Sequence, residues 1–379
     1  MTHGEKYLHI LHFNVAYPAD YGGAIDAFYK LKALHNAGVK IFLHCFEYGR
    51  GRQPILSQFC EEVFYYPRNT DATAALSTLP YIVNSRKNEA LLNNLLKNDY
   101  PIFMEGVHCT YLLNDERFKK RRTYVRLHNV EQEYYKGLYS TSTHWGKKAY
   151  FLQEFVKLKY YEASIAKKAT AFWAVTDNDV QFYRQNLGAP DVDVLPLFLP
   201  DWPCKTELGL GGFCLYHADL SIEANEKAAI WLIEKVFQPL KLPLVIAGKN
   251  PSAKLEQIAH KDAHTCLVAN PADLELNDMI AKAQINVLPA FNTGGMKLKL
   301  LHALYSGKFL VANSTMLHGT PFAEACTVAN SAEEFTQAIA GLYNEYFTEL
   351  HLAQRKTVLG QTFDNDANAQ KMIGWIWGR

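Results

Sequence analysis

Residues 285–313 read INVLPAFNTGGMKLKLLHALYSGKFLVAN, and this stretch decides the fold. Apolar runs stand at both of its ends. A turn of small residues follows the first run, and a basic segment with helical spacing leads to the second, which begins after Gly307. The order predicts a strand, a glycine loop, a helix and a second strand. Such a unit is typical of a parallel α/β sheet.

The glycine loop of this unit is a candidate site for an anion. Gly294 and Gly295 would let the backbone approach a ligand closely. The N–H groups and positive dipole end of the following helix favour a negative charge. Lys297 and Lys299 stand in the first turn of that helix, where the dipole disfavours cations, and a bound phosphate would explain their position. The alternative is a crossover helix with two solvated lysines.

Length and composition limit the classes of protein to consider. A chain of 379 residues exceeds one ordinary core, so two domains are expected. A net charge of +1, without a nucleic-acid motif, argues against a nucleic-acid partner. The seven scattered cysteines form no C-x-x-C pair, which predicts reduced thiols and no zinc site. With no signal peptide and no apolar run of ~18 residues, we expect a cytoplasmic protein without a transmembrane helix.

The first half of the chain opens with a predicted βαβ unit. Strands are expected at 7–14 and 39–45, with a helix at 24–36 between them. Gly22 and Gly23 fall at the first strand–helix turn, which is the usual ligand side of a doubly wound sheet. The alternative is a tight turn that needs a positive φ.

Polar residues also crowd the end of the predicted strand 123–127. His128, Asn129 and Glu131 follow it directly, and His128 is suited to hydrogen bonding or proton transfer near neutral pH. The alternative is that His128 and Asn129 cap the next helix. Glu105 ends another predicted strand, and we favour a solvated loop carboxylate there.

The second half repeats the alternation of strands and helices after a proline-rich crossing at 199–210. His217 and Asp219 end its first strand and would meet a ligand or each other. Lys249 follows Gly248 at the end of the next strand, where an ammonium can reach a diphosphate. Before the crossing, a basic, aromatic helix is expected at residues 145–168. Either it contacts an anionic membrane peripherally, or its aromatic residues are core, its lysines are solvated and its glutamates dilute the charge.

These motifs together resemble the retaining family four (group 1) glycosyltransferases with the GT-B fold. Residues 293–303 correspond to the donor-binding run Gly-x-Gly-x-[Arg/Lys]-x-Lys-x-x-Glu-Ala, and residues 244–251 to Ile-Ala-Gly-x-x-Pro. The run Arg-x-His-Asn-Val-Glu at 126–131 resembles one branch of that family. The chain departs from the pattern at three positions: His302 replaces the carboxylate before the alanine, Gly294 replaces a second carboxylate, and Ala218 replaces a glycine.

The resemblance implies two Rossmann-like doubly wound parallel-sheet domains facing a cleft. The expected parts are an acceptor-side domain at 1–200, a nucleotide-sugar domain at 201–362 and a helix at 363–379 that crosses back to the first domain. It also implies transfer, with retention and without a metal, from a UDP- or GDP-sugar to a glycan or lipid-linked acceptor in polysaccharide biosynthesis. The nucleotide-sugar is a co-substrate, and no tightly bound cofactor is expected.

Roles for single residues follow from the same resemblance. His128 is expected to act on the donor sugar, with Asn129, Glu131 and His302 positioning that sugar. The donor and its phosphates would be bound by the remaining candidates, which are Gly22, Gly23, His217, Asp219, Lys249, Gly294, Gly295, Lys297 and Lys299.

Two further classes of function stay open at this point. The loss of acidic residues at 294 and 302 is compatible with a weak or inactive GT-B protein that binds a nucleotide or a glycan. A GT-B sugar-nucleotide epimerase is the other alternative. It needs several carboxylates and histidines converging on one sugar, and we cannot assemble that set from the sequence.

Overall fold

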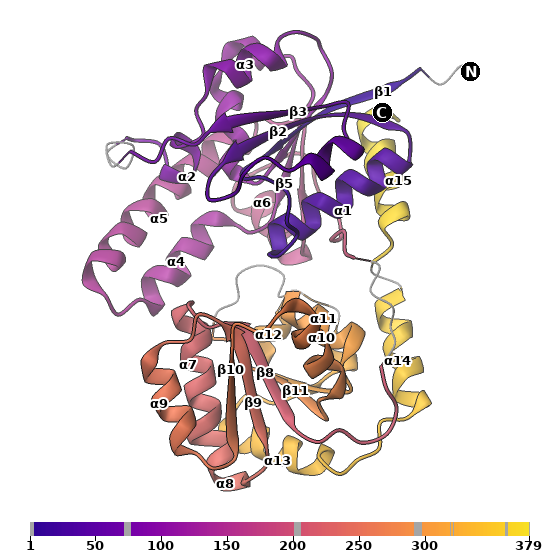
Figure 1. Cartoon of the computed structure of the whole chain (residues 1–379). Helices are drawn as coiled ribbons and strands as arrows, with labels where there is room; N and C mark the ends of the chain where they lie inside the picture. The colour runs from indigo at the N-terminus through magenta and orange to yellow at the C-terminus, as the bar shows by residue number, and fades with distance from the viewer. Residues whose placement is uncertain are drawn as a thin grey trace. The chain divides into compact units, whose positions relative to one another are not determined.

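The computed structural model describes residues 4–71, 77–200, 206–291, 298–318, 320, 322–360 and 363–378. The predicted site residues Gly294, Gly295 and Lys297 therefore lie outside the described residues. The chain divides into two compact units. Unit 1 contains the described residues up to Pro200 and from Phe363 onward, and unit 2 contains the described residues from Thr206 to Gly360 (Figure 1).

Unit 1 is built on a seven-stranded parallel sheet with the order β3-β2-β1-β4-β5-β6-β7. Its strands are β1 (Lys6–His12), β2 (Val39–Glu47), β3 (Glu62–Pro67), β4 (Ile102–Glu105), β5 (Thr123–Leu127), β6 (Ala171–Ala174) and β7 (Val192–Val194). Every residue of β4, β5 and β6 is buried, as expected for a parallel sheet with both faces covered. The strand order reverses between β1 and β4, and in such sheets ligands bind at the carboxyl ends of the strands beside this point.

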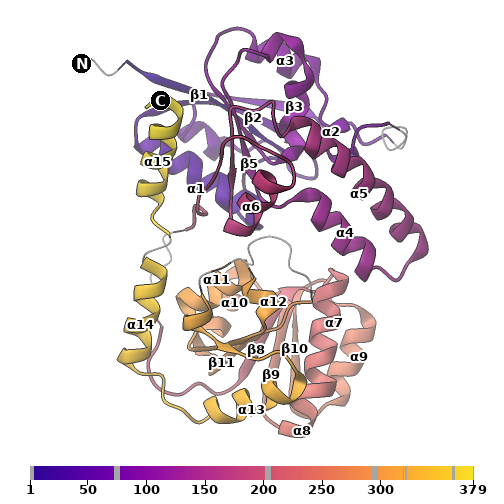
Figure 2. The same cartoon turned by 180° about the vertical axis from the view of Figure 1, so that it is seen from behind.

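Helices cover both faces of the unit 1 sheet (Figures 1 and 2). They are α1 (Gly22–Asn36), α2 (Tyr81–Asn84), α3 (Glu89–Leu95), α4 (Glu131–Thr141), α5 (Trp145–Ile165), α6 (Asp177–Gln185) and, from the end of the chain, α15 (Asn365–Trp377). Helix α15 packs beside α1, and its Trp375 ring lies 4.9 Å from the ring of Trp173 in β6. The last helix of the sequence therefore completes the core of the first unit.

Unit 2 repeats the same architecture with a six-stranded parallel sheet of order β10-β9-β8-β11-β12-β13. Its strands are β8 (Cys214–Asp219), β9 (Leu244–Lys249), β10 (Thr265–Ala269), β11 (Ile285–Leu288), β12 (Phe309–Ala312) and β13 (Thr327–Val328). Its helices are α7 (Glu223–Trp231), which continues as a π-helical turn (Leu232–Phe237), α8 (Gln238–Leu240), α9 (Ala253–Lys261), α10 (Asp273–Lys282), α11 (Leu298–Ser306), α12 (Ser314–Leu317), α13 (Ala332–Leu342) and α14 (Glu349–Gly360). Here the strand order reverses between β8 and β11.

The predicted fold class is confirmed: both units are doubly wound, Rossmann-like parallel-sheet domains. The predicted unit at 285–313 appears as β11, α11 and β12, with β11 and β12 paired in parallel. The alternative of a tight turn with a positive φ at Gly22 and Gly23 is wrong, because both residues form the first turn of α1 and neither has a positive φ. A Cβ at Gly23 would lie 2.8 Å from Cζ of Phe13, so the Phe13 ring would have to shift to accept a larger residue there.

The described part of the chain bears on two expectations, which are the absence of a transmembrane helix and the presence of reduced cysteines. Within the described ranges no helix combines the length and apolarity needed to cross a bilayer. The six cysteines that the structure describes are free thiols.

The tightest glycine contact at the ligand edge of unit 2 yields a stability prediction. A Cβ at Gly248, near the end of β9, would lie 1.9 Å from the Ala218 carbonyl oxygen and 2.9 Å from Leu220 Cγ. Since backbone cannot yield easily, Gly248→Ala should lower the free energy of unfolding by about 1–3 kcal/mol. Urea denaturation would measure this loss of unfolding free energy. Gly341→Ala in α13 is the matched control, because a Cβ there meets nothing within 4 Å and should stabilise the helix. Equal effects of the two changes would contradict the prediction.

Candidate functional site

The carboxyl edge of the unit 1 sheet carries His128. It follows β5 directly and lies beside the end of β4, because β4 and β5 pair in parallel as far as Glu105 and Arg126. The Nε2 atom of His128 lies 2.9 Å from Glu105 Oε2. The imidazole keeps 15% of its surface exposed, whereas the Glu105 side chain is fully buried. His128 is thus oriented by a carboxylate beneath it.

A buried chain of alternating charges holds that carboxylate. The Lys30 ammonium of α1 lies 2.6 Å from Glu105 Oε1 and 2.9 Å from Asp26 Oδ2. Asp26 in turn pairs with Arg126 Nε at 3.2 Å, and its Oδ1 accepts the N–H of Phe198 at 2.8 Å. None of these four ionic side chains is more than 1% exposed. The network connects α1, β4 and β5, and it orders the segment after β7.

The charges of this network fix the tautomer of His128. Burial alone would raise the pKa of Glu105, but Lys30 and the hydrogen bond from His128 outweigh it and lower the pKa to about 2. The ionised carboxylate has only acceptor atoms, so Nε2 of His128 must donate to it. In the neutral imidazole the lone pair then lies on Nδ1. His128 can therefore accept a hydrogen bond from a hydroxyl through Nδ1.

Asp26, Glu105 and His128 also have the residue types of a metal site, with candidate ligand atoms within 4.8 Å of one another. The Lys30 ammonium, however, already contacts both carboxylates. Arg126 supplies a second positive charge to Asp26. The two carboxylates are thus neutralised by two cations of the chain itself, and this set of residues fits a charge network rather than a metal centre.

Most of this network was not predicted from the sequence. The favoured interpretation of Glu105 as a solvated carboxylate is wrong, because the residue is fully buried. Two signals were present in the sequence. Lys30 lies on the apolar face of the predicted helix, and Arg126 lies inside an otherwise apolar strand. A charged residue at a predicted core position requires a buried partner.

The start of α4 places Asn129 and Glu131. The alternative in which His128 and Asn129 cap this helix is wrong, because the Glu162 carboxylate of α5 accepts the N–H groups of Glu131 and Gln132, at 3.1 and 2.9 Å. Glu131 itself is only 4% exposed. Burial, followed by the neighbouring Glu162, raises the pKa of Glu131 to about 8. A role for its side chain in positioning a sugar stays a prediction.

The carboxyl edge of the unit 2 sheet carries the second group of candidates. Asp219 and Lys249 are register partners at the ends of β8 and β9, and both are exposed. Asp219 Oδ1 accepts hydrogen bonds from the backbone N–H of Ser221 at 3.0 Å and from its hydroxyl at 2.6 Å. The Asp219 carboxylate therefore binds the turn after β8. The Lys249 side chain is exposed to solvent at the same edge of the sheet.

Lys299 reaches the same turn from α11. Its Nζ lies 3.1 Å from Asn225 Oδ1, and Asn225 donates through Nδ2 to the Asp219 carbonyl oxygen at 2.9 Å. The ammonium also lies 5.0 Å from the centre of the Tyr216 ring. Lys299 and Lys249 therefore bring two cations to one edge of unit 2, and their role in binding a phosphate stays a prediction.

His217 and His302 lie behind this edge. Their ring centres are 6.1 Å apart and the rings meet edge to face. Burial lowers the pKa of His302 to about 4, and it lowers the pKa of His217 well below its usual value, with His302 and Lys299 adding to the effect. Both rings are neutral at pH 7. His217 Nε2 is buried without a hydrogen-bond partner in the described part of unit 2.

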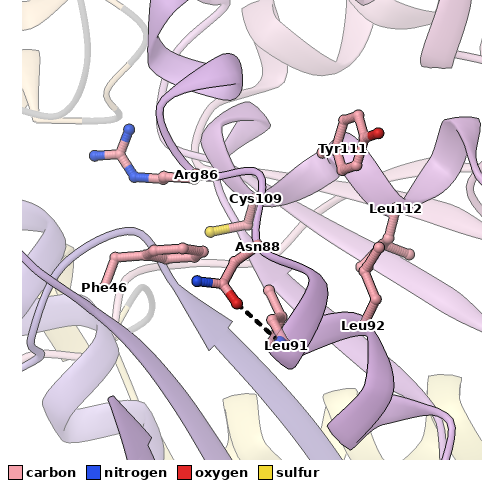
Figure 3. A pocket seen from close by; sticks show the side chains of 8 residues that line it. All are labelled: Phe46, Arg86, Asn88, Leu91, Leu92, Cys109, Tyr111 and Leu112. Atoms are coloured by element: carbon pink, nitrogen blue, oxygen red, sulfur yellow. Dashed lines mark hydrogen bonds between the residues drawn. The ribbon is translucent and has the colours of Figure 1, made fainter. Parts of the chain in front are cut away.

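A small cavity in unit 1 is not a ligand site. Phe46, Arg86, Asn88, Leu91, Leu92, Cys109, Tyr111 and Leu112 line it (Figure 3). Its volume is about 10 Å³, which is room for about one water molecule. One of its walls is the start of α3, where the Asn88 side chain caps the helix by accepting the N–H of Leu91 at 3.1 Å.

A protein family and a bacterial protein are similar in sequence to this chain. A family model described as glycosyl transferases group 1 matches residues 213–345, most of unit 2. An "Uncharacterized 44.6 kDa protein in cps region" of Klebsiella pneumoniae is 25% identical over 342 residues, which cover 85% of this chain and 87% of that protein.

Solved structures share the fold over nearly the whole chain. The Anabaena protein HepE, in complex with UDP and glucose, has a TM-score of 0.68 and 11% identity, covering 99% of this chain and 100% of its own. WaaG, a glycosyltransferase involved in lipopolysaccharide biosynthesis, has a TM-score of 0.66 and 14% identity, covering 98% and 100%. The chain therefore has the GT-B fold, and the family match supports glycosyl transfer.

The buried ammonium of unit 1 yields a stability prediction. Lys30→Met should lower the free energy of unfolding by about 3–5 kcal/mol, because it leaves Asp26 and Glu105 buried without their shared cation. Chemical denaturation would measure the loss. Lys40→Met is the control, since Lys40 pairs with Glu61 at the surface with 42% of its side chain exposed, and its loss should cost less than about 1 kcal/mol. A difference below 1 kcal/mol between the two variants would show that the network is not energetically coupled.

The buried Glu131 carboxyl yields a pH prediction. Its pKa of about 8 in the folded state exceeds the ordinary value of 4.5, so folding binds a proton between these values. That contribution to stability is complete below pH 4.5 and is lost as the pH rises toward 8. Glu131→Gln should therefore flatten the fall in unfolding free energy between pH 5 and pH 8. Glu133→Gln, an exposed position of the same helix, should leave the slope unchanged, and an unchanged slope in Glu131→Gln would refute the assignment.

Proposed function

We propose that the protein transfers a sugar from a nucleotide-sugar to a glycan or lipid-linked acceptor, with retention and without a metal ion. The observation that carries the proposal is the pair of cations, Lys249 and Lys299, at the carboxyl edge of the sheet in the segment matched by the group 1 family model. A nucleoside diphosphate is the leaving group of such a reaction, and its developing negative charge needs fixed cations.

Unit 2 is proposed to bind the donor diphosphate. Lys249 is exposed, whereas Lys299 is held by Asn225 and lies near the Tyr216 ring. A positioned ammonium stabilises a leaving group without the reorganisation that free side chains require. These two lysines supply positive charge that a divalent metal supplies in other transferases. Gly294, Gly295 and Lys297 complete the proposed phosphate site.

The base of the donor is proposed to be uracil, with guanine as the alternative. Support comes from the structural neighbours: one is a complex with UDP and glucose, and an Escherichia coli trehalose-6-phosphate protein was solved with UDP-2-fluoro glucose. The neutral rings of His217 and His302 are proposed to hydrogen-bond the donor, because an uncharged imidazole can both donate and accept.

His128 is proposed to contact the transferred sugar. Its Nε2–H is committed to Glu105, which leaves Nδ1 to accept a hydrogen bond from a sugar hydroxyl. Glu105 acts through His128 and is a positioning residue. Asn129 and the backbone at Gly22 and Gly23 lie at the same edge of unit 1 and are proposed as additional contacts.

The acceptor is proposed to belong to a cell-surface polysaccharide. WaaG is involved in lipopolysaccharide biosynthesis, and the Klebsiella pneumoniae relative is described as lying in a cps region. A second candidate function is a protein that binds a nucleotide-sugar but turns it over weakly. The observation that favours it is His302, a neutral residue where the resembled family has a carboxylate.

Nucleotide binding is the decisive test. Isothermal titration with UDP, GDP, ADP and their sugar conjugates should show micromolar binding of one nucleotide, with UDP expected. Lys249→Met combined with Lys299→Met should weaken it at least about tenfold, because both cations lie at the diphosphate edge. Lys254→Met, on the exposed side of α9, is the matched control. No binding by any nucleotide would refute the proposed donor site.

Turnover separates the two candidate functions. If the chain is a transferase, donor hydrolysis or transfer will be measurable, and His128→Ala will reduce its rate while leaving nucleotide affinity unchanged. Tight nucleotide binding without any consumption of the sugar conjugate would favour the binding protein.

A further inference from the structure

Two arginine side chains converge at the carboxyl edge of the unit 1 sheet. Arg68 follows β3 directly, and Arg86 comes just after α2. Arg68 Nε donates to Ser85 Oγ at 3.1 Å, and Arg86 Nη1 donates to the same oxygen at 3.4 Å. One hydroxyl therefore holds two guanidinium groups of like charge close together. We call Arg68 and Arg86 the arginine pair.

Arg86 is the buried member of the pair, with 6% of its surface exposed. Its Nε donates to the Phe13 carbonyl oxygen at 2.9 Å and its Nη1 to that of Ile82 at 2.6 Å. These carbonyl groups satisfy N–H donors but carry no net charge. Nη2 makes no hydrogen bond with the residues that the structure describes, and Figure 3 shows the guanidinium turned away from the leucines of the small cavity. Burial lowers the pKa of Arg86 to about 10, and the nearby Arg68 adds to the effect.

Arg68 is half-buried and lies against two aromatic rings. Its Cζ atom is 4.3 Å from the centre of the Tyr48 ring and 5.4 Å from that of Tyr81. Stacking on a ring restrains a guanidinium while its N–H groups stay able to donate. In the described part of unit 1, only Nε of Arg68 makes a hydrogen bond, the one to Ser85. Arg68 thus presents two Nη groups in the fork geometry that binds a carboxylate or a phosphate with parallel hydrogen bonds.

The two arginines that follow β2 have carboxylate partners. Arg50 pairs with Asp20, and Arg52 Nε lies 3.7 Å from Glu47 Oε1. The arginine pair forms no ion pair with any residue in the described ranges. Burial raises the pKa of Glu131 to about 8 despite the nearby guanidinium of the pair, so this carboxyl is mostly protonated at pH 7. A buried cation is normally paired, and here the described residues supply no counter-charge.

The Phe13 ring connects the arginine pair to His128. Its centre lies 5.9 Å from Arg86 Cζ and 5.9 Å from the centre of the His128 ring. The rings of His108 and Tyr21 also adjoin it, at 4.8 and 6.4 Å. His108 Nδ1 and the Tyr21 hydroxyl oxygen are buried without a hydrogen-bond partner among the described residues. Buried polar atoms are usually hydrogen-bonded, so this part of unit 1 lacks polar partners as well as a negative charge.

We propose that the arginine pair binds the anionic group of an acidic sugar, either a carboxylate or a phosphate, in the acceptor substrate. That this sugar belongs to the acceptor rests on the proposed function, in which His128 contacts the transferred sugar. The guanidinium groups donate to the oxyanion, and the acidic sugar extends past Phe13 toward His128. A neutral sugar leaves both guanidinium groups without a counter-charge, so the site selects acidic acceptor units.

Binding of single sugars to the full chain tests the proposal without a nucleotide. Saturation-transfer NMR titrations should show that glucuronic acid or glucose 6-phosphate binds at least about tenfold more tightly than glucose, because hydrogen bonds to a charged group are the stronger ones. The acid that binds more tightly identifies the group as a carboxylate or a phosphate. Arg68→Met should remove this preference, weakening the acidic sugar about tenfold or more.

Two further variants separate the site from general effects of charge and folding. Arg117→Met is the matched control, because Arg117 is an exposed arginine of unit 1 that pairs with Asp115 and Glu89, and its loss should leave sugar binding unchanged. Arg86→Lys keeps the positive charge but removes the planar fork, so it should weaken the acidic sugar about fivefold. Circular dichroism checks that this variant is folded; if it is not, Arg68→Met at the half-buried position decides.

The proposal is overturned if glucose binds as tightly as both acidic sugars, or if Arg68→Met binds the acidic sugar as tightly as the wild-type chain does. It is also overturned if inorganic phosphate binds as tightly as glucose 6-phosphate while glucuronic acid does not bind, because the pair then holds an adventitious ion only. Binding of an acidic sugar without binding of any nucleotide would refute the proposed function alone. Nucleotide binding without a preference for acidic sugars would refute this site alone.

Discussion

The buried ion pair between Lys30 and Glu105 is the constraint on which the ligand edge of unit 1 depends. One ammonium is shared by a carboxylate of its own helix and a carboxylate of β4. Arg126 satisfies the first carboxylate and donates to the carbonyl oxygens of Leu195 and Pro196. Because each charge is buried, none can change position without leaving another unpaired. The same buried network therefore determines both the position of α1 on the sheet and the orientation of the His128 ring.

Such a network is a costly means of stabilisation. Apolar residues of similar volume often give equal or greater stability than a buried ion pair, because desolvation offsets most of the Coulomb attraction. The network also orients an imidazole through a hydrogen bond, which apolar packing cannot do. Nε2 of His128 is held at 2.9 Å from a carboxylate whose pKa of about 2 keeps it ionised at any physiological pH. We therefore interpret the network as a device for geometry, which specifies one tautomer of one histidine.

The limits of sequence analysis follow from the range of these interactions. The unit at 285–313 was predictable because apolar runs, glycines and helical spacing are local properties, and β11, α11 and β12 occur in the predicted order. Lys30 and Glu105 are 75 residues apart, and no local pattern pairs them. The same applies to Glu162, which caps α4 from another helix, where the alternative interpretation had His128 and Asn129 as the cap. Long-range pairing of buried polar groups was what the sequence could not specify.

The departures from the resembled family at positions 294 and 302 each replace a carboxylate by a residue without a negative charge. A carboxylate at position 302 would partly neutralise the nearby cations, whereas the His302 ring is neutral, with its pKa lowered to about 4. Lys249 and Lys299 then act on an edge whose remaining candidate acid, Asp219, already accepts hydrogen bonds from Ser221. At the proposed donor site, the attraction for a diphosphate would be preserved or strengthened, while an acceptor for sugar hydroxyls would be lost. For the proposed transfer reaction, we therefore expect the departures to affect sugar selection and turnover more than nucleotide affinity, so that variants can separate these two properties.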